Sequence, residues 1–217
     1  MHAGCFLPPP RTLLRAPVRL ATRSRAHAHT RCCRPLLCAQ GYRMRSENYD
    51  EARNNPDHDG GIRTAVNAWS MDPAAAKARY GPIASWDTSD ITNMWRLFAY
   101  KKDFNEDISR WNVSNVGNMS CMFAGATSFD GDLSSWNVSN VVDMSSMFNG
   151  ATSYNGDLLC WNVSNVESMH LMFSAATSFE RQLGGAWATS TAHQCCMFRN
   201  SPGTIAGMTK DANGSIE

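Results

Sequence analysis

The feature that most constrains this sequence is a phrase that recurs at a constant period of about 25 residues. It reads WNVSNVGNMSCMF at 111–123, WNVSNVVDMSSMF at 136–148 and WNVSNVESMHLMF at 161–173. The tryptophans keep this spacing at Trp86, Trp111, Trp136 and Trp161, and Trp187 follows one position late. Repetition at such a period is typical of chains in which each unit buries its apolar face only against its neighbours. We therefore expect a stack of similar units.

Within each unit the apolar positions predict one strand and one helix. Val116, Met119 and Phe123 follow the spacing of one helical face, so a helix is expected over 116–126. A strand is expected over 108–113, with a bend near Ser109 and Arg110 because the apolar residues on either side have opposite parity. The expected fold class is α/β, a parallel, leucine-rich-repeat-like solenoid of about 25-residue strand–helix units with a helical N-terminal cap.

Two kinds of repeated position have expected structural roles. The Trp, Met and Phe residues stand at fixed offsets within the unit, which indicates a core and not a ligand surface. The residues directly after the tryptophans are expected to form a stacked ladder of side-chain hydrogen bonds, because turns must satisfy their backbone groups. This structural ladder comprises Asp87, Asn112, Asn137 and Asn162.

The remaining segments divide the chain around the repeats. Residues 61–85 are expected to be a helical N-terminal cap, in which Asp72 is an N-cap residue and Pro73 the first helical residue. Residues 86–198 hold four to five repeats, of which the last is degenerate. Residues 199–217 are expected to be a flexible tail.

Residues 1–60 are expected to be a disordered or targeting leader. Residues 1–45 contain nine Arg, no Lys and no acidic residue. This composition fits an organelle transit peptide, a disordered leader or a spurious stretch ahead of the true start. Residues 46–217 carry a net charge of about −8, without the basic stripe that nucleic-acid binding requires. No apolar run is long enough to span a membrane, so no nucleic-acid partner and no transmembrane span are expected.

Sequence patterns for catalysis, metal binding or cofactor binding are weak. The eight cysteines include no C-x-x-C pair, and Cys121 and Cys160 are interpreted as incidental thiols. The stretch HQCC at 193–196 offers a nucleophile or metal pair, but no carboxylate recurs near it. Residues 55–62 and 209–217 resemble calcium loops but lack the acid at the twelfth position, so polar turns are expected. We expect no metal, no cofactor and no enzymatic activity.

The repeated phrase W-[DN]-x-S-[DN]-[VI]-x-x-M-x-x-[ML]-F resembles the BspA-like leucine-rich repeat family, also described as DUF285 or the Mycoplasma-type lipoprotein repeat. The resemblance runs from about Ile62 to Phe198 and includes the segment before the first repeat. It implies a parallel α/β solenoid with roles in surface display, adhesion or partner binding. The sequence departs from the family in lacking a lipobox-like start before the repeats.

The expected function is a non-enzymatic repeat module that binds a protein or a glycan, of the scaffold or adhesion type. Its binding residues are expected in the exposed columns beside the strand: Ser109, Arg110, Ser134, Ser135, Leu159 and Cys160. The alternative is a structural cell-surface or wall glycoprotein, because Asn112, Asn137 and Asn162 each begin an N-x-S sequon. An enzyme using His193 with Cys195 or Cys196 is the third hypothesis. Organelle and cell-surface locations both remain open.

Overall fold

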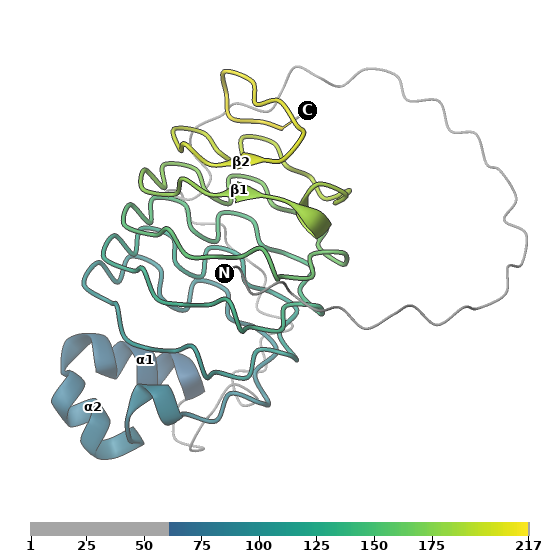
Figure 1. The fold of residues 1–217 in the computed structure, drawn as a ribbon. Coiled ribbons are helices and arrows are strands. Elements are labelled where there is room, and N and C mark those ends of the chain that lie inside the picture. Colours follow the sequence, from purple (N-terminus) through teal and green to yellow (C-terminus); the bar gives the residue numbers. More distant parts are fainter. Residues whose placement is uncertain (1–60, 217) are drawn as a thin grey trace, which may run out of the picture. The chain divides into compact units, whose positions relative to one another are not determined.

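The structure is a computed structural model that describes residues 61–216. The leader and the first calcium-like loop therefore lie outside the described residues, apart from the last two positions of that loop. Two helices, α1 (Gly61–Met71) and α2 (Pro73–Tyr80), are followed by the short 3-10 helix η2 (Ile83–Ser85). Strand β1 (Gln182–Leu183), 3-10 helix η3 (Gly185–Trp187) and strand β2 (Thr204–Ile205) lie near the C-terminus. Between η2 and β1 the chain alternates between turns and irregular segments with isolated bridges (Figure 1).

The helices α1 and α2 form the cap that the sequence predicts. Ile62, Val66 and Trp69 of α1 are buried on one side of the helix, where they join the core. The carboxylate of Asp72 accepts a hydrogen bond from the backbone N–H of Ala75 at 3.0 Å, which satisfies one of the unpaired amides at the start of α2. The predicted N-cap role of Asp72 is therefore confirmed.

The repeated units, which we call coils, lie one above another and are joined by backbone hydrogen bonds (Figure 1). In the coils of Trp86, Trp111, Trp136 and Trp161, four alternate amides donate to carbonyls of the next coil. In the coil of Trp111, the amide of Met119 donates to Asp143 at 2.9 Å and that of Phe123 to Met147 at 2.8 Å. Isolated parallel bridges link neighbouring coils at one further column: Asn93, Asn118, Asp143, Ser168 and His193.

The helix predicted over 116–126 is wrong, because this stretch is a series of turns. The amides of Met122 and Ala126 donate to the third residue before them, whereas those of Cys121 and Gly125 donate to the next coil. Cys121 has φ 56° and Gly125 has φ 68°, values of the left-handed region that a right-handed α-helix excludes. Turns therefore produce the same apolar spacing as a helical face, and the amides that are not used within the turns donate to the next coil.

The strand predicted over 108–113 is also wrong. Residues 109 and 110 form a turn, closed by a hydrogen bond from the amide of Trp111 to the carbonyl of Ile108 at 3.1 Å. The predicted bend at Ser109 and Arg110 is thus present without the strand. The paired strands of the described chain are β1 and β2, which run parallel over two residues each. Strand-type pairing between the earlier coils is confined to single bridges, because turns interrupt the extended backbone.

The repeated aromatic positions form the core, as the sequence predicts. Phe98, Phe123, Phe148, Phe173 and Phe198 make one column of stacked rings, with centroids 5.4–5.5 Å apart. A second column comprises Phe104, Phe129, Tyr154 and Phe179, with centroids 5.8–6.1 Å apart. Nearly all of these rings are inaccessible to solvent, as are the repeated methionines. Stacked rings add to the free energy gained from burying their apolar area.

The tryptophan side chains also tie the coils together by hydrogen bonds. The indole N–H of Trp136 donates to the carbonyl of Ile108 at 3.2 Å, and that of Trp161 donates to Leu133 at 2.9 Å. These carbonyls lie 28 residues earlier in the chain, in the preceding coil. Each buried indole therefore has the polar partner that a buried Trp normally requires.

A side-chain ladder crosses the coils, but from a column that the sequence did not predict. The side-chain amides of Asn115, Asn140 and Asn165 donate to carbonyls of the preceding coil at 2.7–2.8 Å. The predicted ladder residues instead accept from the backbone amide two residues further on, which closes a local turn. These are Asp87, Asn112, Asn137 and Asn162, and all four are exposed.

Residues 199–216, predicted to be a flexible tail, instead close the C-terminal end of the stack. Strand β2 pairs with β1, and Ile205 is buried in the core. The amide of Phe198 donates to the carbonyl of Gly214 at 2.9 Å, and that of Cys196 donates to the hydroxyl of Ser215 at 2.8 Å. The last full coil therefore finds its amide partners in this segment in place of a further repeat.

Tyr154 carries the one hydroxyl in the second aromatic column, and replacing it by phenylalanine is expected to stabilise the protein. The hydroxyl is buried and has no hydrogen-bond partner among the described residues. Leaving a buried polar group unpaired costs about 1–3 kcal/mol, so Tyr154→Phe should raise the free energy of unfolding by about 1 kcal/mol or more. Urea denaturation of the two proteins measures this difference. Phe129→Tyr is the reciprocal control and should destabilise; a loss of stability in Tyr154→Phe would contradict the assignment.

Candidate functional site

The six predicted binding residues lie on one set of turns, between a buried aliphatic residue and the next tryptophan. Arg110, Ser135, Leu159 and Cys160 are exposed, and Leu159 has 49% of its surface accessible. The other two residues, Ser109 and Ser134, are half-buried. Because these turns recur once per coil, they form parallel columns on the stack, which we call the turn face.

Aspartates cap these turns. Asp107, Asp132 and Asp157 accept hydrogen bonds at 2.9–3.0 Å from the amides of Ser109, Ser134 and Leu159 respectively. The hydroxyl and amide of Ser109 lower the pKa of Asp107, and the amide and hydroxyl of Ser134 lower the pKa of Asp132. Sequence reasoning missed this column, although D-I-S at 107–109 and D-L-S at 132–134 repeat it. The turn face is therefore bordered by exposed carboxylates.

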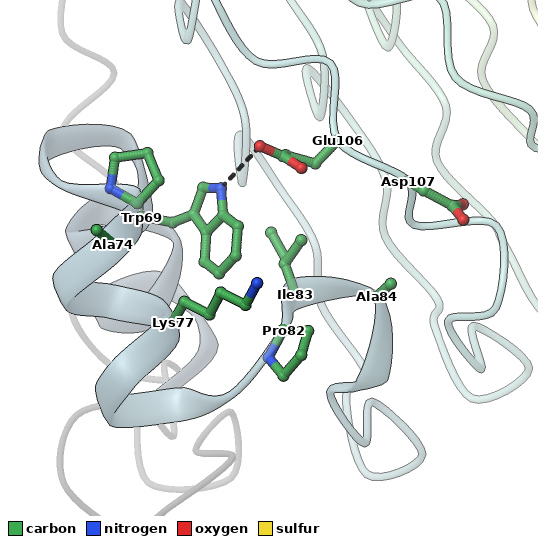
Figure 2. Close-up of a pocket in the computed structure, with 9 residues that line it drawn as sticks. Trp69, Ala74, Lys77, Pro82, Ile83, Ala84, Glu106 and Asp107 are labelled. Atoms are coloured by element: carbon green, nitrogen blue, oxygen red, sulfur yellow. Dashed lines mark hydrogen bonds between the residues drawn. The ribbon is translucent and has the colours of Figure 1, made fainter.

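A cavity of about 390 Å³ lies where the cap meets the first coil. Helix α1 contributes Trp69 and helix α2 contributes Lys77, while η2 and the residue before it contribute apolar surface. Figure 2 shows the indole of Trp69 between the side chains of Lys77 and Glu106, with Asp107 further from the indole, next to Ala84. Asp107 directly precedes the first predicted turn, so the cavity adjoins the turn face.

The polar groups of this cavity carry both signs of charge. The indole N–H of Trp69 donates to the carboxylate of Glu106 at 3.4 Å, across 37 residues of sequence. Lys77 supplies a cation on the opposite side of the indole, and Arg110 lies close enough to Asp107 to lower its pKa further. The cavity is open to solvent and combines apolar surface with a few polar groups.

The other sequence candidates are dispersed. The ring of His193 stacks on that of His170 at 5.6 Å, whereas the sulfur atoms of Cys195 and Cys196 contact each other at 3.3 Å. Asp211 accepts from two amides of the C-terminal calcium-like stretch, which therefore forms a polar turn. Residues 61–216 hold no group of three or more His, Cys, Asp or Glu that could bind a metal ion. In the same part of the chain, no helix has both the length and the apolar character to cross a membrane.

His170 is expected to make the stability of the stack depend on pH. Partial burial lowers the pKa of His170 below its ordinary value of 6.5, an effect that exceeds the opposing hydrogen bond with the carbonyl of Cys195. The unfolded chain then takes up a proton more readily than the folded chain, so stability falls as the pH drops below about 6.5. Urea denaturation at pH 7 and pH 5 measures the loss.

His170→Ser is the matched variant for this prediction, because Ser120 and Ser145 occupy the same position in the two preceding coils. It should lose less stability between pH 7 and pH 5 than the wild-type protein. Equal losses in the two proteins would show that His170 is not the responsible group.

The repeats, together with helix α2, match a known protein family. A family model described as "Mycoplasma protein of unknown function, DUF285" matches residues 69–201, which include the cavity, the turn face and every coil. No curated protein and no solved structure matches the chain.

Proposed function

We propose that this chain, which belongs to the DUF285 family, is a non-enzymatic module that binds a protein partner on its turn face. We further propose that its coils form a parallel solenoid of the leucine-rich-repeat kind, capped by α1 and α2. In such solenoids the repeated units present an extended surface for partners.

The observation that carries this proposal is one column of turns that recurs once per coil, with exposed side chains that differ from coil to coil, beside the buried Trp, Met and Phe columns. Hydrogen bonds to Asp107 and Asp132 hold two of these turns, and the hydroxyl of Ser135 donates to the carbonyl of Ser109 at 3.0 Å. Turns held in this way present side chains at fixed spacing, which reduces the entropy lost on binding. Leu159 adds exposed apolar surface to this face.

Affinity capture with the full chain tests the proposal. The double variant Ser135→Arg/Leu159→Arg places two charges on the turn face and is expected to lose the partners that the wild-type protein retains. Ser153→Arg/Ser178→Arg is the matched control, because it adds the same charge at two exposed positions outside the turn face. Direct binding of a purified captured protein should follow the same order. Equal binding by wild-type and turn-face variant would contradict the proposal.

A structural glycoprotein is the second candidate function, and one observation favours it. Asn112, Asn137 and Asn162 are exposed. All three belong to N-V-S sequons, which receive glycans in secreted proteins. Mass spectrometry of the protein from its own cells, before and after enzymatic deglycosylation, decides this. Modification at these sites supports the structural role, and unmodified asparagine at all three excludes it.

A further inference from the structure

We infer that the cavity between the cap and the first coil binds an arginine side chain of the partner protein. The inference rests on the proposed function and names the chemistry of the partner at one point of the surface. A guanidinium group would lie against the carboxylate of Glu106, and its aliphatic stem would lie on Ile83. Figure 2 shows the carboxylate of Glu106 turned toward Trp69, with Ile83 beside the indole, whereas the carboxylate of Asp107 points away from Trp69.

The charges of the cavity favour a cationic ligand at this end. Glu106 and Asp107 line one side, and Lys77 lies on the far side of the Trp69 indole. Because Arg110 already lies near Asp107, Glu106 is the carboxylate that would face a cationic ligand. Asp132 and Asp157 continue the line of exposed carboxylates along the turn face. A basic segment of a partner would therefore meet a carboxylate in each coil that it crosses, which is the complementarity that selects partners at protein interfaces.

Glu106 interrupts the repeat at the position that lines the cavity. The equivalent residues in the next two coils are Gly131 and Gly156, where a Cβ atom would come within 2.9 Å of the ring of Phe129 or within 2.5 Å of the hydroxyl of Tyr154. The two middle coils therefore leave no room for a side chain here, and only the coils of Trp86 and Trp161 carry one, Glu106 and Arg181 respectively. By contrast, Asp107 recurs in the following coils as a turn cap. Glu106 is the residue that distinguishes a ligand site from a repeated turn.

The carboxylate of Glu106 retains capacity for a ligand. It accepts the indole N–H of Trp69 at 3.4 Å, which is long for a hydrogen bond. An ionised carboxylate has two oxygens and about four acceptor positions, so it can accept from a guanidinium group in addition. Arginine matches this site better than lysine because its planar donors form paired hydrogen bonds with carboxylates.

Titration of the full chain with N-acetylarginine amide tests the inference. The indole N–H resonances of the seven tryptophans are followed by NMR, and Trp69 is identified by its loss in Trp69→Phe. The Trp69 resonance is expected to shift in a saturable way. N-acetylcitrulline amide, the uncharged analogue of similar shape, is expected to bind at least about tenfold more weakly, because hydrogen bonds to charged groups contribute about 1.5–3 kcal/mol. Equal shifts with both compounds, or none with either, would overturn the inference.

Glu106→Gln removes the charge and keeps an oxygen that can accept the indole N–H. It should weaken binding of N-acetylarginine amide by about tenfold. Asp143→Asn is the matched control, because the preceding coil carries Asn118 at the same position and the site lies outside the cavity. It should bind as the wild-type protein does, and a loss equal to that of Glu106→Gln would refute the assignment. This titration requires no partner protein, so its failure is distinguishable from a failure of affinity capture.

Discussion

Replacing Phe148 by alanine is expected to lower the free energy of unfolding by about 3–5 kcal/mol. Its ring is fully buried and stacks on Phe123 and Phe173 with centroids 5.5 Å away, and on Tyr154 at 4.1 Å. The truncation removes contacts in three coils at once and leaves a cavity that the flanking rings cannot fill by moving independently. Urea denaturation followed by tryptophan fluorescence measures the loss.

Two comparisons sharpen this prediction. Phe148→Leu keeps most of the apolar volume and should cost less than the alanine variant, because the cost follows the cavity that remains. An exposed truncation, Val142→Ala, should have little effect, since Val142 has 42% of its surface accessible. If Phe148→Ala cost no more than Val142→Ala, the aromatic column would not be the core of the stack.

Replacing Gly214 by alanine is expected to be the most damaging change in the C-terminal segment. Gly214 has φ 77°, and a Cβ atom there would overlap the backbone of Phe198 and Arg199. The left-handed backbone alone costs an alanine about 1–2 kcal/mol, and relief of the overlap adds about 1–3 kcal/mol. Relief also requires the closing segment to move away, which breaks the bond between the amide of Phe198 and the carbonyl of Gly214.

Gly207→Ala is the control that isolates the steric effect. Gly207 has φ 78°, almost the same backbone conformation, but no atom lies within 4 Å of the position that a Cβ atom would take. Gly207→Ala should therefore lower the free energy of unfolding only by the cost of the left-handed backbone conformation. Thermal unfolding of both variants measures the difference between them. Equal destabilisation of the two proteins would show that the closing segment does not pack against the last coil.

The sequence predicts the composition of the core better than it predicts the path of the backbone. Fixed offsets identify Phe123 and Phe148 as core residues because burial follows directly from the period of the repeat. The same offsets do not distinguish a helix from successive turns, since both bring the third or fourth residue to the same side. Turns form here and not a helix because amides such as that of Cys121 donate to the next coil and not to a carbonyl within their own coil. Hydrogen bonds between coils cannot be predicted from the spacing of apolar residues.

The candidate site is predictable in part. Ser135 and Leu159 stand at positions that vary between coils beside constant residues, and both side chains are exposed. The cavity is different, because it combines Trp69 with Glu106 through the packing of a cap that belongs to no repeat. The one available signal was Glu106 itself, which stands in a column where the next two coils carry glycine. The role of Glu106 cannot be inferred from the sequence without knowing that the Trp69 side chain contacts it.

The constant step from each amide to its carbonyl partner in the next coil has a consequence for how such chains change in evolution. If one whole unit were duplicated within the stack, each backbone amide at the junction would find an equivalent carbonyl in the inserted coil. The aromatic rings on both sides of the insertion would again stack on aromatic rings. Tandem duplication or loss of a whole unit thus preserves the contacts between coils. Insertion or deletion of a single residue instead disturbs every hydrogen bond and ring contact across that junction. Selection can therefore alter the length of the turn face in whole units while the two ends stay as they are.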